Sequence, residues 1–269
     1  MFWWSPQILS MKPRTSRGRG ILAKGLAVLA ALFVWQIGAM WLGQRVLLVS
    51  PLSVAGRLCT IWREPGFFAA IWFSFSRIAR GFFAGFALGI LLATLAGRFP
   101  ILETVFLPYL LTVKSVPVAS FIVIALLWLS SADLSIFISF LMVLPIVYNN
   151  VLAGIRNVDP KMVEMAQVFH LSFGKRLLYI WLSQVKPYLL SACATSIGLA
   201  WKSGIAAEII GIPDGSMGEM LYEAKVYLNT RDLFAWTVVI VAVSVLFEKA
   251  FLWMLKRLFA VWETHGGAV

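Results

Sequence analysis

Six long apolar runs dominate the sequence and restrict what it can fold into. A helix that crosses the hydrocarbon core of a bilayer needs about twenty mainly apolar residues. Runs of that length cover roughly residues 21–42, 71–96, 105–129, 134–154, 188–210 and 233–255. They do not alternate between apolar and polar positions, which argues against a β-barrel. We expect an all-α polytopic membrane protein with about six transmembrane helices, the first retained as a span and not cleaved as a leader.

The charge balance supports a membrane environment and no nucleic-acid partner. Only 13% of the residues are charged and 61% are hydrophobic, whereas soluble domains are about one quarter charged. The net charge of +11 has a simple origin, because basic residues of bilayer proteins collect on the cytoplasmic side. Membrane lipid is therefore the expected surroundings. The two cysteines, Cys59 and Cys193, show neither ligand spacing nor a disulfide pattern.

The positions of lysine and arginine predict the orientation. With the N-terminus inside, most basic residues outside the spans lie on the cytoplasmic side, so both termini are expected there. We divide the chain into a tail (1–20), a transmembrane domain (21–258) and a second tail (259–269). A short helix is expected within residues 43–70, and a surface-lying or partly re-entrant piece within 211–231. Pro108 and Pro117 predict a kinked or broken third span.

Residues 157–187 form a polar interruption on the predicted cytoplasmic side. Asp159-Pro160 is a strong helix start, because the aspartate can cap free amides and proline at the first position gives up no hydrogen bond. Met162, Ala166 and Phe169 then share a face, with Val163 beside them. We expect Ser172-Phe173-Gly174 to break the helix and a second helix to cover about 175–183. Such a pair suits a groove on a partner protein, or else lies on the lipid surface as a connector.

The order of residues resembles the EAA signature of bacterial ABC importer permeases. That pattern reads Glu-Ala-Ala-x3-Gly-x9-Ile-x-Leu-Pro, and Glu164, Ala166, Ile180 and Leu182 match it at the right spacing. Three positions depart, with Met165, His170 and Ser183 in place of Ala, Gly and Pro. The stretches Gly154–Ala166 and Ala207–Gly218 resemble the subgroup that imports nitrate, taurine and alkanesulfonates.

The resemblance implies a type I ABC importer permease fold in a bacterial inner membrane. Its coupling helix would fit a cleft on an ATP-hydrolysing subunit. The residues implied in coupling are Asp159, Met162, Val163, Glu164, Ala166, Gln167, Phe169, His170 and Leu171. The chain has no Gly-rich phosphate loop, so we expect no cofactor on it, with ATP and Mg²⁺ bound by partner ATPase subunits. Two such subunits, a second permease copy and an extracytoplasmic substrate-binding protein complete the implied assembly.

Charged residues within spans are costly and tend to be functional. We expect Lys114, Ser115, Trp201, Lys202 and Ser203 to line the translocation path, and the surplus of cations indicates an anionic solute. The alternative for each lysine is a structural link to a carbonyl group or a lipid headgroup. The glycines Gly81, Gly85 and Gly89, spaced by four, predict close helix packing.

Two other functional classes remain to be weighed. An ion-coupled secondary transporter would need carboxylates within its spans, and Glu208 is the one near-span candidate. An intramembrane enzyme would need a nucleophilic or metal-binding cluster, and the two histidines, His170 and His265, fall in segments predicted to be aqueous. The main expectation is therefore a permease, with the ATPase activity on a separate chain.

Overall fold

The computed structural model describes residues 17–43 and 48–266, and all of its regular structure there is helical. The predicted N-terminal tail lies mostly outside these residues. In chain order the helices are α1 (Arg17–Leu42), α2 (Pro51–Ile61), α3 (Phe67–Arg98), α4 (Pro100–Ser115), α5 (Val118–Ala125), α6 (Ser131–Arg156), α7 (Pro160–Val168), α8 (Phe173–Arg176), the π-helical turn η1 (Leu177–Leu182), α9 (Ser183–Gly211), α10 (Met217–Val226) and α11 (Thr230–Gly266).

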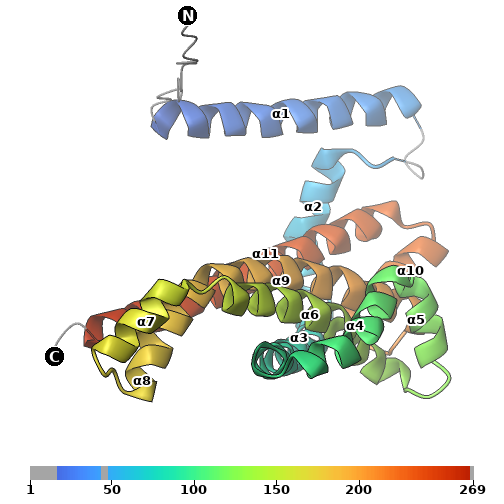
Figure 1. Cartoon of the computed structure of the whole chain (residues 1–269). Helices are drawn as coiled ribbons and strands as arrows, with labels where there is room; N and C mark the ends of the chain where they lie inside the picture. The colour runs from blue at the N-terminus through green and yellow to red at the C-terminus, as the bar shows by residue number, and fades with distance from the viewer. Residues whose placement is uncertain (1–16, 44–47, 267–269) are drawn as a thin grey trace, which may run out of the picture.

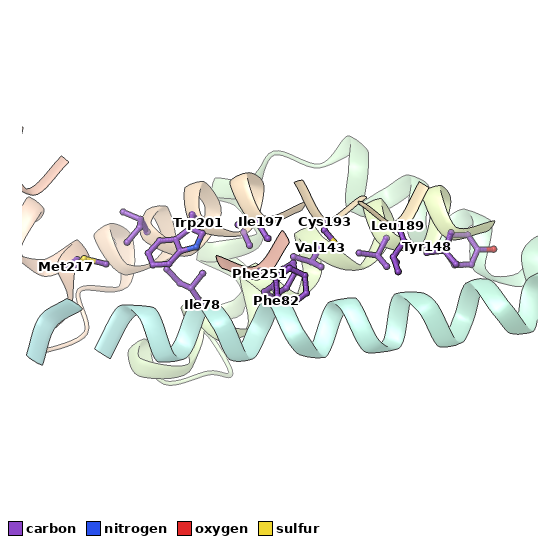
Figure 2. Close-up of a cluster of buried hydrophobic side chains, with 14 of the residues drawn as sticks. Ile78, Phe82, Val143, Tyr148, Leu189, Cys193, Ile197, Trp201, Met217 and Phe251 are labelled. Carbon is purple, nitrogen blue, oxygen red and sulfur yellow. The ribbon is translucent and has the colours of Figure 1, made fainter. Parts of the chain in front are cut away.

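The core of the molecule is a layer in which α6 lies between α3 and α9. Small residues allow the close approach, as the glycine spacing predicts. A Cβ added at Gly85 would lie 2.8 Å from the Phe140 carbonyl oxygen, and one at Gly89 would lie 2.9 Å from the Val147 Cβ. The buried side chains form a continuous apolar row along this layer, from Met217 at one end to Tyr148 at the other (Figure 2).

Four helices are long and apolar enough to cross a membrane, and they contain residues 25–42, 67–98, 131–156 and 230–262. The pair α4 and α5 counts as a fifth span that bends by 101°. Pro117 lies at this bend, while Pro108 remains inside α4, so only one of the two prolines breaks the predicted third span. Helix α9 has 29 residues but contains Lys202 and Glu208, and it is not among the helices apolar enough to qualify. It packs against α3, α6 and α11 instead of facing lipid all round.

Helix α1 lies apart from the core layer, and α2 bridges the space between them (Figure 1). The expected short helix is confirmed as α2, which begins at Pro51. Ser50 caps this helix, because its side chain accepts a hydrogen bond from the Ser53 amide. The Arg57 guanidinium in α2 forms ion pairs with Asp232 at the start of α11 and with Glu64. The hydrogen bonds that the Arg57 guanidinium donates to the Asp232 carboxylate are the main reason that the pKa of Arg57 is raised above its ordinary value.

The two ends of the bundle carry different elements. Helices α5 and α10 lie at one end, whereas α7, α8 and the last turns of α11 lie at the other (Figure 1). With 37 residues, α11 is about 55 Å long, which exceeds a hydrocarbon core of about 30 Å. It continues to Gly266, so most of the predicted C-terminal tail is helical. Helix α11 is therefore longer than one crossing of the bilayer requires, and its last turns lie at the same end of the bundle as α7.

Candidate functional site

Helix α7 begins at the residues that the sequence indicates. The Asp159 carboxylate accepts a hydrogen bond of 2.9 Å from the Lys161 amide, and Pro160 takes the first helical position. The Asp159 amide donates a hydrogen bond of 2.9 Å to the side-chain oxygen of Gln184 in the first turn of α9. This bond links two segments that lie 25 residues apart and fixes where α7 starts. Sequence reasoning did not single out Gln184, because nothing in the local pattern marks its partner.

The end of α7 is a tight turn at His170. Its φ is +50°, the left-handed conformation that glycine adopts most easily. The His170 amide bonds to the Gln167 carbonyl at 3.0 Å and the Leu171 amide bonds to the Ala166 carbonyl at 2.9 Å, which is the Schellman pattern of a helix end. The expectation that Ser172-Phe173-Gly174 makes the break is therefore wrong. His170 makes the turn itself, at the position where the EAA pattern has glycine.

The faces of α7 also differ from the prediction. Ala166 is fully buried, whereas Met162 and Met165 are each 45% exposed and Phe169 is 71% exposed. Met162, Ala166 and Phe169 have the predicted helical spacing, but Ala166 is buried while Met162 and Phe169 are exposed, so the three do not form one exposed apolar surface. Met162, Met165 and Phe169 follow the helical spacing of three and four and form an exposed ridge, which we call the α7 ridge. Glu164 and Gln167 are exposed beside it.

The predicted second helix of the pair does not stand alone. Helix α8, the turn η1 and α9 follow one another without a break from Phe173 to Gly211, and Pro187 lies inside α9. The expected separate elements at 175–183 and 188–210 are therefore one rod with a π-helical turn. Ile180 of the EAA-like pattern is buried in this turn. Movement of α8 and η1 can pass directly into the buried helix α9, because no flexible loop separates them.

The predicted path residues divide into two groups. Trp201 and Ser203 are buried, and Trp201 packs against Phe75 and Phe247 with ring centroids 6.2 and 6.3 Å away. Lys114, Ser115 and Lys202 are exposed in this single chain.

Lys114 and Lys202 each precede, by four residues, a residue at the contact between α5 and α9. Lys202 lies one helical turn before Ala206, and Lys114 precedes the bend that leads to Val118. Ala206 and Val118 pack against one apolar cluster between these helices. The sequence placed both lysines within predicted spans, and both are exposed in this single chain.

Glu208 connects three helices through hydrogen bonds. Its side chain is fully buried, and its Oε2 accepts hydrogen bonds from the Ser74 hydroxyl at 2.6 Å and the Gly218 amide at 3.3 Å. The Ser74 hydroxyl accepts a bond of 2.9 Å from the Met217 amide. Glu208 thereby fastens the first turn of α10 to α3 and α9. Within the described part of the chain, no three His, Cys, Asp or Glu side chains gather as a metal site requires.

The family comparison decides among the functional classes. The model of the family described as "Binding-protein-dependent transport system inner membrane component" matches residues 85–259, which include α7, both lysines, α6, α9 and the C-terminal part of α3. The chain belongs to this family. It is a membrane permease of the ABC importer type and is not itself catalytic.

Two transport proteins are similar to this permease over most of the length of both chains. The putative aliphatic sulfonates transport permease protein SsuC of Bacillus subtilis is 27% identical, over 94% of this chain and 92% of the relative. The taurine transport system permease protein TauC of Escherichia coli K12 is 26% identical, over 87% and 86%. A crystal structure of an amino acid ABC transporter with histidines matches 77% of this chain and 97% of that chain, with a TM-score of 0.53 and 16% identity. This match shows the shared fold, and the permease is a multi-pass inner-membrane protein.

Proposed function

We propose that two copies of this permease form a pathway for a small anionic solute. An extracytoplasmic binding protein delivers the solute, and two separate ATPase subunits, which bind ATP and Mg²⁺, drive transport. The observation that carries the proposal is the α7 ridge, an exposed row of apolar side chains on a helix that is capped at both ends. Both termini and α7 lie on the cytoplasmic side in this arrangement, in line with the distribution of basic residues.

The ridge has the features of a helix that docks in a groove. Met162, Met165 and Phe169 supply the apolar anchors, and methionine adapts well to irregular surfaces. Asp159, Val163, Glu164, Gln167, His170 and Leu171 complete the proposed coupling segment. Buried Ala166 and the bond between Asp159 and Gln184 transmit force from the ridge to α9. Approach of the two ATPase subunits would then tilt α9 as a rigid rod and expose the pathway alternately to the two sides.

A charge placed on the ridge tests the coupling role. Met165→Glu should lower solute uptake at least tenfold, because burying an unpaired carboxylate in the partner's groove costs roughly 2 kcal/mol or more. Uptake and ATP hydrolysis by the reconstituted complex are measured together with retention of the ATPase subunit on the permease. Val226→Glu is the matched control, since Val226 is also exposed but lies on α10 at the opposite end. Full uptake and normal subunit retention in Met165→Glu would contradict the proposal.

The proposed pathway surface comprises Lys114, Ser115 and Lys202, with Trp201 and Ser203 supporting it from within the core. The relatives are named for aliphatic sulfonates, taurine and bicarbonate, which are small solutes with an acidic group. Two lysines beside a bent helix are suited to such anions, because broken helices in bundles can line polar cavities. An ion-coupled carrier is disfavoured, since Glu208 is engaged with Ser74 and the Gly218 amide.

Neutral replacements test the lysines. Lys114→Met and Lys202→Met should each reduce anion uptake about tenfold or more while the complex assembles normally, because each removes a cation from the path. Uptake of a radiolabelled sulfonate, taurine or bicarbonate is compared with the amount of assembled complex. Arg80→Met is the control, since Arg80 is an exposed cation on α3 that bonds to the Ser76 carbonyl oxygen. Wild-type uptake in both lysine variants would overturn this part of the proposal.

A further inference from the structure

A cavity of about 570 Å³ lies at the end of the bundle that carries α7. It is enclosed by the last turns of α3 and α6, by α8 and η1, and by the first turns of α9, with Val163 of α7 at its edge. Its size falls within the range of pockets that hold small organic ligands. The proposed coupling and pathway surfaces do not account for it, because neither the α7 ridge nor the two lysines line it.

The floor of the cavity is apolar and continues the seam between α3 and α11. Phe82 and Phe86 of α3 pack against Phe251 of α11, with ring centroids 5.1 and 5.8 Å apart. Ile90 and Thr94 extend the same face of α3 by one and two helical turns, and both line the cavity. No α11 residue within the described range lines it. The groove therefore opens where α11 no longer covers α3, on a face that is apolar like the lipid-facing surface around it.

Two arginines line this largely apolar cavity. Arg98, at the end of α3, and Arg176, at the end of α8, both line it. The ion pairs of the described residues join other partners, namely Arg57 with Glu64 and Asp232, and Arg156 with Glu103. Arg98 and Arg176 thus lack a carboxylate, and guanidinium groups bind phosphate well through paired hydrogen bonds.

We propose that this cavity binds one anionic phospholipid of the inner leaflet, with an acyl chain on the apolar floor and the phosphate between Arg98 and Arg176. A zwitterionic lipid would bring its own cation to the two arginines, and a soluble anion would leave the apolar floor uncovered. Basic pockets between helices on the cytoplasmic side are known to hold anionic headgroups. The assignment to the inner leaflet rests on the proposed cytoplasmic position of α7.

The bound lipid would connect the coupling segment to the π-helical turn. It would contact Val163 of α7 and also Trp181 of the π-helical turn, two elements that otherwise meet through few residues. Turns of the π type are common at functional sites. An occupied cavity would hold α7 and η1 at a fixed separation and make their movement more nearly rigid.

Native mass spectrometry of the intact complex, extracted from vesicles of phosphatidylcholine and phosphatidylglycerol, tests the site. Wild-type complex should retain phosphatidylglycerol in preference to phosphatidylcholine. The double change Arg98→Gln and Arg176→Gln should lower that retention about thirtyfold, since each basic residue near an anionic headgroup contributes about fivefold. Lys161→Gln with Lys175→Gln is the matched control, because both lysines are exposed at the same end and do not line the cavity.

A second variant fills the cavity and leaves both arginines in place. Thr94→Trp would place a large ring over the apolar floor and should abolish retention of phosphatidylglycerol while both arginines remain. Unchanged retention of phosphatidylglycerol in both the arginine and the tryptophan variants would show that the lipid binds only elsewhere on the surface. That result would overturn the proposal. Retention by the permease alone but not by the complex would show that a partner subunit covers the cavity, which also overturns it. Lipid retention is read without transport, so a failure of Met165→Glu to uncouple leaves this result standing.

Discussion

At the scale of single residues, His170 shows how a departure from a family pattern can keep the geometry of that pattern. The residue takes a φ of +50° and makes the turn that glycine makes in the EAA signature. A residue with a Cβ pays roughly 1 kcal/mol or more for this conformation. The two Schellman hydrogen bonds at Gln167 and Ala166 offset part of that cost.

Replacing His170 should therefore change the stability of this turn in a predictable direction. His170→Gly should stabilise the end of α7 by roughly 1 kcal/mol, because glycine adopts the left-handed conformation without a steric penalty. Hydrogen exchange of the α7 amides, measured in detergent, should slow about fivefold. His170→Val should accelerate exchange, since a β-branched residue is least tolerant of positive φ. Equal exchange rates in the glycine and valine variants would contradict this account of the turn.

At the scale of elements, the seam between α3 and α6 determines how the layer is built. Gly81, Gly85 and Gly89 bring the two helices into contact, and a Cβ at Gly81 would collide with the Ile136 carbonyl. The same principle acts between α9 and α10, where a Cβ at Gly218 would collide with the Cβ of Glu208. Small residues therefore fix the distance between elements at both places.

A bulky residue in the seam should separate the helices. Gly85→Leu is expected to destabilise the permease by roughly 1–3 kcal/mol, because the Cβ position is 2.8 Å from the Phe140 carbonyl oxygen and 3.0 Å from the Val143 Cβ. Thermal unfolding followed by tryptophan fluorescence measures the change. Gly198→Ala is the control, since nothing lies within 4 Å of an added Cβ and alanine favours helix by roughly 0.5–1 kcal/mol. A seam variant as stable as this control would refute the packing role.

At the scale of the whole molecule, one end of the bundle carries α7 and the other carries α5 and α10 (Figure 1). The fold separates the proposed coupling segment from the elements on the proposed outer side. The continuous helical run from α8 to Gly211 joins the two ends, and at its far end Glu208 accepts a hydrogen bond from the Gly218 amide of α10.

The native cysteines provide a test of orientation. Cys59 is exposed in α2 and Cys193 is buried, so a membrane-impermeant maleimide applied to spheroplasts should label Cys59 alone. Cys59→Ser should remove the label. Lys161→Cys in that background should be labelled only in inverted vesicles, because α7 is proposed to face the cytoplasm. Labelling of Cys59 only in inverted vesicles would reverse the proposed orientation.

The sequence alone determined much that depends on local chemistry and on the bilayer. Long apolar runs predicted the helices, Asp159-Pro160 predicted where α7 starts, and spacing from Glu164 to Leu182 indicated the family. These predictions succeed because helix capping and membrane insertion act over neighbouring residues. The break at Pro117 succeeded for the same reason, although Pro108 shows that one proline can remain inside a helix.

The tertiary structure decided which side of each helix faces a neighbour. Ala166 is buried and Met165 beside it is 45% exposed, although both are apolar residues of α7. Trp201 is buried between Phe75 and Phe247 while Lys202 points outward, a difference that the sequence pattern did not contain. Gln184 gains its role from Asp159, which lies 25 residues away in the chain. Burial depends on which surfaces meet, and only the packing of distant helices sets that.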